Sequence, residues 1–123
     1  MGSLTTHVPD TTRGQPGSHI SVTLYQLEGE RRQSIKTVVT NDDGRCDEPL
    51  LENDQFVVGI YELVFSVGPY FTAQECTAPD QPDVAQPRSL DDVVIRFGVS
   101  ASEQNYHVPL LITPNSYSTY RGS

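Results

Sequence analysis

Hydrophobic and polar residues alternate along several short segments of the chain, a period of two that is typical of strands with one buried face. The clearest segment, residues 105–113, places apolar side chains at every second position from Tyr106 to Ile112. His107 falls on the other set of positions, together with a proline and a threonine. The alternation predicts a strand that contributes to a core and directs His107 away from it.

The same pattern predicts further strands along the chain. They cover residues 4–8, 20–25, 35–40, 60–67 and 93–97, with a short edge strand at 49–51. Turn signals separate them, because residues 28–31 suit a hairpin turn, residues 41–44 a tight turn, and Gly68-Pro69 ends the strand before it. Loops are expected at residues 10–17 and 77–88, and only residues 70–75 suit a short helix.

These elements predict an all-β fold, an antiparallel β-sandwich of seven to eight strands with one short helix. A length of 123 residues suits one domain with one core. We therefore expect residues 1–123 to form a single domain, with residues 1–3 (Met-Gly-Ser) either disordered or a remnant of cloning.

The net negative charge of the chain excludes some classes of binding partner. The net charge is −8 and the isoelectric point is near 4.6, which argues against binding to nucleic acid and to anionic membrane surfaces. The chain has no apolar run long enough for a transmembrane helix and no signal-peptide pattern at its start, although a mature secreted form would lack one. We expect a cytoplasmic protein, with the peroxisome and the periplasm as alternatives.

The two cysteines, Cys46 and Cys76, are too few for a disulfide scaffold. Their spacing matches no zinc pattern, and no third ligand accompanies the histidines. We expect free thiols, no metal and no cofactor.

Candidate chemistry lies in the histidines, one arginine and the end of the chain. His7 and His107 each fall on the polar side of a predicted strand, whereas His19 precedes a strand and is expected to be solvated or structural. Arg45 directly follows the predicted tight turn. Taken one at a time, each of these residues is more often an ordinary surface residue, and a chain end is usually frayed.

Three separated motifs make a functional role for these residues the favoured interpretation. They are Leu-Thr-Thr-His-Val at residues 4–8, Thr-Asn-Asp-Asp-Gly-Arg at residues 40–45, and the late strand Tyr-His-Val-Pro-Leu-Leu (residues 106–111) followed by Tyr-Arg-Gly-Ser at residues 120–123. Together they resemble the transthyretin-related proteins, the 5-hydroxyisourate hydrolases. The terminal Tyr-Arg-Gly-Ser is the signature of that family, and transthyretin itself lacks it.

The resemblance covers nearly the whole chain, with two departures. Pro9 stands where the family usually has an apolar residue, and residues 86–91 replace its usual Pro-Phe-Leu-Pro stretch. Both departures lie outside the polar positions of the motifs, so they affect the expected loops rather than the expected chemistry.

The resemblance implies hydrolysis of 5-hydroxyisourate to 2-oxo-4-hydroxy-4-carboxy-5-ureidoimidazoline in urate degradation. It also implies a homotetramer, a dimer of dimers, with the sites at a central channel between the dimers. Ring opening by water requires an activated water, stabilisation of an oxyanion, and a proton for the leaving nitrogen.

Residue roles follow from the same resemblance. His7 and His107 would share water activation and proton transfer, in an order that stays open, and Arg45 would bind the substrate and stabilise charge. Tyr120, Arg121 and Gly122 would close the substrate pocket. The Ser123 hydroxyl and the terminal carboxylate would hydrogen-bond water or substrate.

Two other classes of function remain as alternatives. The first is a non-enzymatic small-ligand carrier like transthyretin, although that protein has other residue types in place of His7, Arg45 and His107. Two histidines and an arginine suit a polar anion better than a hydrophobic ligand. The second is a generic sandwich module that binds other proteins, which would explain the strands but not the three polar motifs.

Overall fold

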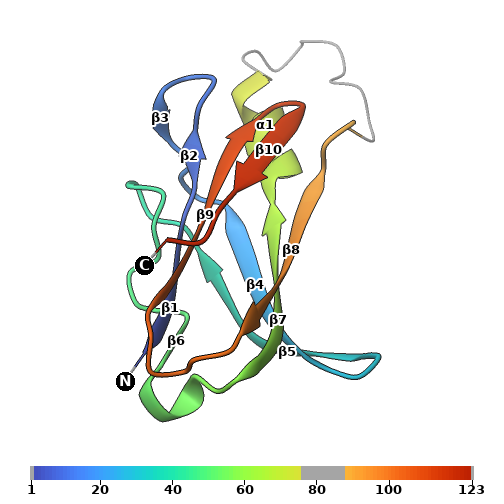
Figure 1. Ribbon diagram of the computed structural model, residues 1–123. Helices are drawn as coiled ribbons and strands as arrows, with labels where there is room; N and C mark the ends of the chain where they lie inside the picture. Colours follow the sequence, from blue (N-terminus) through green and yellow to red (C-terminus); the bar gives the residue numbers. More distant parts are fainter. Residues whose placement is uncertain (1, 76–87, 123) are drawn as a thin grey trace.

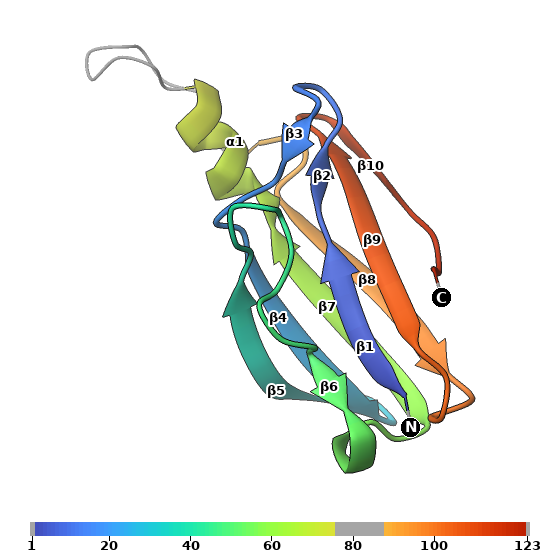
Figure 2. The same cartoon turned by 90° about the vertical axis from the view of Figure 1, so that its left-hand side faces the viewer.

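The structure, a computed structural model, describes residues 2–75 and 88–122 and consists of two β-sheets packed face to face (Figures 1 and 2). In the first sheet the order is β3 (Gln15–Pro16), β2 (Pro9–Asp10), β9 (Tyr106–Thr113), β1 (Ser3–His7) and β6 (Leu51–Glu52), and β10 (Ser116–Thr119) also pairs with β9. In the second the order is β5 (Arg31–Val39), β4 (Ser21–Glu28), β7 (Gly59–Ser66) and β8 (Asp92–Val99). The helix α1 (Val67–Glu75) follows β7, and a 3-10 turn, η1, covers Asn53–Gln55.

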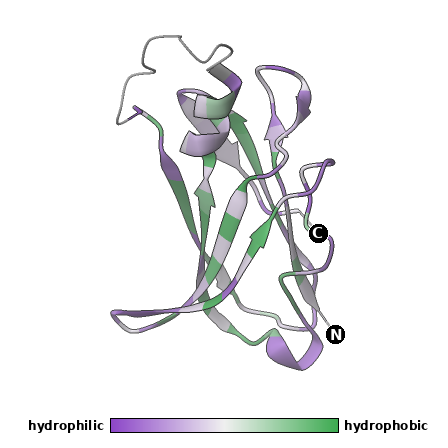
Figure 3. Cartoon of the chain, turned by 180° about the vertical axis from the view of Figure 1, so that it is seen from behind, coloured by the Kyte–Doolittle hydropathy of each residue, from purple (hydrophilic) through white to green (hydrophobic). Residues whose placement is uncertain are grey.

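The core lies between the sheets and is built from the alternating apolar positions of both. From β7, Tyr61, Leu63 and Phe65 are fully buried, and from β9 Leu110 and Ile112 are fully buried as well. Figure 3 shows hydrophobic and hydrophilic residues following one another along the strands. Each side chain buried in this way stabilises the fold by roughly 1.5–3 kcal/mol, so the alternation read from the sequence decides which face of each strand is inside.

The predicted sandwich and its short helix are confirmed, but the pairing is mixed rather than purely antiparallel. β1 and β2 both pair with β9 in parallel, whereas the other named pairs are antiparallel. The alternation of a strand carries no information on the direction of its neighbour, so the sequence pattern did not reveal this. The described part of the chain has ten named strands, of which four are only two to four residues long.

Several elements differ from their predicted ranges, and three of these differences have identifiable reasons. β5 begins at Arg31 because its hairpin with β4 continues through polar residues that lack an apolar period. The helix begins at Val67 and includes Pro69, since the first turn of a helix leaves its N–H groups unpaired and therefore tolerates proline. The predicted loop at residues 10–17 contains the short β2–β3 hairpin.

The chain start is structured from Gly2 onward, so Gly2 and Ser3 are not a disordered end. The Gly2 N–H donates to the Ser102 carbonyl at 3.0 Å, and Ser3 is the first residue of β1. Met1 lies outside the described residues, as does the predicted loop at residues 77–88 except for its last position.

A buried carboxylate ties the helix to the first sheet. Asp10 is fully buried, and its Oδ2 accepts a hydrogen bond of 2.7 Å from the Tyr70 hydroxyl on α1. Its Oδ1 accepts from the backbone N–H groups of Thr12 (3.1 Å) and Arg13 (3.4 Å). Burial, followed by the hydrogen bond to Asp10, raises the pKa of Tyr70 to about 12, so the phenol stays protonated and remains a donor.

Replacing Tyr70 with phenylalanine removes one donor to this buried carboxylate. We expect Tyr70→Phe to lower the free energy of unfolding by about 1–3 kcal/mol, because the carboxylate is left partly unsatisfied. Urea denaturation monitored by circular dichroism measures the change. Tyr117→Phe, which removes a hydroxyl from a residue that is 45% exposed, is the matched control. Equal stability of the two variants would contradict a stabilising role for the Tyr70–Asp10 contact.

Candidate active site

The parallel pairing of β1 with β9 brings the two candidate histidines onto one face. In this register Thr5 lies opposite His107, and His7 lies opposite Pro109. Neighbouring residues of each strand, Leu4 and Val108 among them, are buried in the core, so the histidines are directed to the outer face of the sheet. Both are half-buried, which confirms the orientation predicted for them.

A tight turn carries Arg45 to the same place. The Asn41 Oδ1 accepts hydrogen bonds from the N–H groups of Asp43 (2.9 Å) and Arg45 (3.1 Å), which closes the turn. Gly44 has a φ of +73°, and a Cβ there would lie 2.7 Å from the Val8 carbonyl oxygen, so only glycine fits. The Val8 N–H donates to the Gly44 carbonyl at 2.8 Å. The backbones of Arg45 and His7 pair in an isolated antiparallel β-bridge.

The end of the chain reaches the site from the other side of β9. β10 pairs antiparallel with β9 as far as Thr119 opposite Leu110. Pro109 has no N–H and therefore cannot donate a hydrogen bond to the neighbouring strand. Its carbonyl accepts a hydrogen bond of 2.7 Å from the Thr119 hydroxyl. Pairing resumes at Gly122, whose N–H donates to the His107 carbonyl (2.7 Å) and whose carbonyl accepts from the His107 N–H (3.2 Å).

Gly122 lies directly against the His107 side chain. A Cβ built at Gly122 would be 3.3 Å from both Cβ and Cδ2 of His107, closer than ordinary contact. The absence of a side chain at this position therefore lets the terminal backbone pack against the imidazole edge.

Arg121 is placed elsewhere in the isolated chain. Its guanidinium carbon lies 3.9 Å from the centroid of the Tyr106 ring, and its Nη2 donates to the Gln104 Oε1 and the Asn105 carbonyl at 3.1 Å each. Because Tyr106 belongs to the core-facing positions of β9, this is the side of the strand opposite His107. Arg121 and Tyr120, which is 60% exposed, line a pocket of about 240 Å³ with residues of β8.

The structure thus groups His7, Arg45, His107 and Gly122 and does not bring Arg121 to them within one chain. Ser123 lies outside the described residues. His19, the third histidine, is exposed, with its Nε2 4.0 Å from the Asp42 Oδ1, in line with the solvated role expected for it.

Burial and one arginine keep both histidines neutral. Burial lowers the pKa of His7, the positive charge of Arg45 and the charge that His107 gains on protonation lower it further, and Asp43 opposes the shift. Burial and then Arg45 lower the pKa of His107. A neutral imidazole near pH 7 can accept a proton or donate a hydrogen bond, which suits water activation.

These pKa values also affect stability. Each folded-state pKa is below the ordinary value of 6.5, so the unfolded chain binds more protons than the folded one as pH falls below 6.5. Stability is therefore retained above that pH and is lost as the pH falls toward the folded pKa values.

One residue of the site was missed from the sequence. The Thr5 Oγ1 lies 2.8 Å from Nδ1 of His107, in a half-buried position on the neighbouring strand. Its place on the polar side of its strand with His7 was visible, but its pairing with His107 depends on the parallel register.

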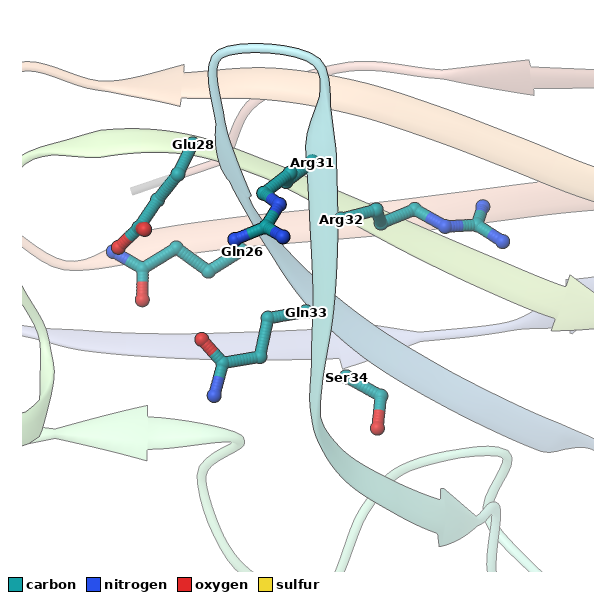
Figure 4. A pocket seen from close by; sticks show the side chains of 6 residues that line it. All are labelled: Gln26, Glu28, Arg31, Arg32, Gln33 and Ser34. Atoms are coloured by element: carbon teal, nitrogen blue, oxygen red, sulfur yellow. The ribbon is translucent and has the colours of Figure 1, made fainter.

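Other surface features of the described residues carry less chemistry. A hollow of about 520 Å³ at the β4–β5 hairpin is open and lined by Gln26, Glu28, Arg31, Arg32, Gln33 and Ser34 (Figure 4). No group of three potential metal ligands is found in residues 2–75 and 88–122, and Cys46 is a free thiol. No helix within those ranges has the length and apolar character needed to cross a bilayer.

Replacing Arg45 with glutamine tests the electrostatic coupling. We expect Arg45→Gln to raise the pKa of both His7 and His107, because a positive charge that disfavours imidazolium is removed. Proton and nitrogen NMR titration of the imidazoles measures this without any substrate. Arg31→Gln makes the same change of net charge at the remote hairpin and should leave both pKa values in place. Equal shifts in the two variants would show that overall charge, not proximity, sets the histidine pKa values.

Comparisons with known proteins agree on one family. The family model described as "Transthyretin: HIUase/Transthyretin family" matches residues 4–122. The chain is 50% identical to the 5-hydroxyisourate hydrolase of Pseudomonas aeruginosa, over 100% of this chain and 93% of that protein. It is 53% identical to the 5-hydroxyisourate hydrolase of Ralstonia nicotianae, with both proteins covered completely.

Solved structures give the same result. The crystal structure of (S)-allantoin synthase superposes with a TM-score of 0.87 at 39% identity, and it covers 99% of this chain. The chain spans only 44% of that longer protein. The structure of Klebsiella pneumoniae 5-hydroxyisourate hydrolase superposes with a TM-score of 0.77 at 28% identity, covering both chains completely.

Proposed function

The chain belongs to the HIUase/Transthyretin family and is a hydrolase, and we propose that it opens the ring of 5-hydroxyisourate in urate degradation. The observation that carries the proposal is the grouping of two neutral histidines with Arg45 on one face of the first sheet. The relatives named above, which carry this activity in their names, support the choice of substrate. The match over residues 4–122 supports treating residues 1–123 as one transthyretin-like domain.

The reaction consumes one water and breaks one C–N bond. The oxygen of water adds to the carbonyl carbon of the cyclic amide, and the carbonyl oxygen becomes an oxyanion. When the oxyanion collapses, the C–N bond breaks and the ring nitrogen takes a proton, so the opened ring carries a new carboxyl group and a new N–H group in one molecule. The product is 2-oxo-4-hydroxy-4-carboxy-5-ureidoimidazoline, and no cofactor or metal enters this scheme.

In this proposal the pair His7 and His107 provides the acid–base chemistry. A neutral imidazole removes a proton from water as it attacks, and general acid–base help of this kind contributes roughly 10²–10⁴-fold. Arg45 holds the planar, oxygen-rich substrate through its guanidinium and stabilises the developing negative charge. Arg45 itself is exposed, so its guanidinium can reach a ligand above the sheet.

The chain end completes the site in the proposal. Gly122 packs against His107, and Tyr120, Arg121 and Ser123 would close the pocket over the substrate. One chain leaves Arg45 exposed and the histidines on an open face, which supports an assembly in which a second copy covers them. We propose a homotetramer, a dimer of dimers, with the substrate enclosed between facing sheets.

A histidine variant tests the assignment directly. We expect the wild-type protein to accelerate the decay of freshly generated 5-hydroxyisourate and to form one product enantiomer, and His107→Asn to reduce kcat by about 100-fold or more. Ultraviolet absorbance follows the substrate and circular dichroism the product. His19→Asn, at an exposed histidine with a φ of +61° that asparagine tolerates, is the matched control. No acceleration by an intact wild-type protein would favour a carrier that binds without turnover.

Shortening the chain tests the terminal segment. Deleting residues 120–123 should abolish hydrolysis, because Gly122 no longer packs on His107 and the pocket loses its closing residues. The melting temperature should stay close to that of the full chain, since β10 ends at Thr119. Normal turnover by the shortened protein would exclude the chain end from the site.

A further inference from the structure

The imidazole of His107 is held on both edges by its neighbours. On one edge the Thr5 Oγ1 lies 2.8 Å from Nδ1, and on the other edge Gly122 approaches Cδ2. In an imidazole ring Nδ1 and Cδ2 are the two atoms bonded to Cγ, and they lie on opposite sides of it. The ring therefore presents its tip, formed by Cε1 and Nε2, away from the sheet and toward any substrate above it.

The hydrogen bond at Nδ1 can run in either direction, because a hydroxyl both donates and accepts. Among the described residues, His107 is the one hydrogen-bond partner found for the Thr5 side chain. If Thr5 accepted a proton from Nδ1, its own hydrogen would have no partner within that part of the chain. If Thr5 donates, its hydrogen is satisfied, Nδ1 is the acceptor, and the proton of the neutral ring resides on Nε2.

His7 lies on the same face of the sheet, opposite Arg45 across an isolated β-bridge, and is half-buried. Burial and the neighbouring positive charge of Arg45 lower its pKa, so its imidazole is available as a base near pH 7.

We propose that Thr5 is a positioning residue that donates its hydroxyl hydrogen to Nδ1 of His107 and thereby holds this histidine with its proton on Nε2. The inference rests on the proposed function for its catalytic meaning, but the tautomer itself does not depend on that function. His107 then donates a hydrogen bond from Nε2 to the oxyanion. His7 takes the proton from the attacking water and transfers it to the leaving nitrogen, so no other proton source is required.

Two substitutions of Thr5 separate the hydroxyl from the shape of the side chain. Thr5→Val keeps the branched shape suited to a strand and removes the hydroxyl, whereas Thr5→Ser keeps the hydroxyl. Thr23→Val, on the outer face of the second sheet, makes the same chemical change at a hydroxyl whose one side-chain hydrogen-bond partner among the described residues is the hydroxyl of Thr37 (3.1 Å). All three are compared with the wild type by nitrogen NMR of 15N-labelled histidines, with His107→Asn to assign the signals.

In the wild type and in Thr5→Ser we expect Nδ1 of His107 to appear as an unprotonated, hydrogen-bonded nitrogen and Nε2 as a protonated one. In Thr5→Val we expect a mixture of the two tautomers. We expect kcat to be roughly 3- to 10-fold lower, because this factor corresponds to the loss of one net hydrogen bond. KM should change less than kcat, since the ring is misaligned rather than absent. Thr23→Val should match the wild type in both measurements.

Two results would overturn the inference. One is a wild-type spectrum with the proton on Nδ1, which would make Thr5 the acceptor and Nε2 a base. The other is a Thr5→Val protein with the spectrum and kcat of the wild type. Because the spectra need no substrate, a protein that fails to hydrolyse 5-hydroxyisourate but shows the expected tautomers would contradict the proposed function and leave the role of Thr5 intact.

Discussion

The site depends on the parallel pairing of β1 with β9, which joins residues 102 positions apart in the chain. Closing so long a loop costs conformational entropy, and the buried faces of the two strands offset that cost. Leu4 is fully buried, and the Thr6 hydroxyl donates to the Val108 carbonyl at 2.6 Å inside the sandwich. A shift by one residue would direct His7 into this core and Thr6 out of it. The register that satisfies the core is therefore also the register that presents the histidines.

Backbone contacts at two glycines complete the arrangement. Gly44 lets the turn before Arg45 approach the Val8 carbonyl, and Gly122 lets the chain end approach the ring of His107. In both places the pairing is made by main-chain N–H and carbonyl groups. This pairing does not use the side chains of Arg45 and His107, while the strands and turns that carry them are fixed by hydrogen bonds.

The electrostatics of the site differ from those of the whole molecule. The chain carries a net charge of −8, yet Arg45 provides a positive charge next to two histidines whose pKa values are lowered. A cation beside neutral imidazoles suits an oxygen-rich, readily ionised substrate and leaves the histidines able to act as bases at neutral pH. The sandwich by itself does not imply this chemistry, because one fold supports many functions and the residues on its surface decide among them.

The local pattern of the sequence was enough to predict the core strands. The alternation from Tyr106 to Ile112 identified both the buried face of β9 and the outward direction of His107, since side-chain period is a property of the strand itself. The motifs containing His7, Arg45 and His107, read through a family resemblance, singled out residues that the structure then brought together. The direction in which the pKa values of His7 and His107 shift could not be predicted in this way, because burial and the distance to Arg45 depend on packing.

Tertiary structure alone decided how those residues meet. The parallel direction of β1 and β2 on β9, the contact of Thr5 with His107, and the packing of Gly122 against that ring join segments that are distant in sequence. It also placed Arg121 over Tyr106 instead of beside the histidines. Periodicity is set by neighbours along the chain, whereas strand partners and register are set by the packing of a complete core. For this reason the sequence by itself determined which side chains face outward, and only the folded chain determined which of them share a site.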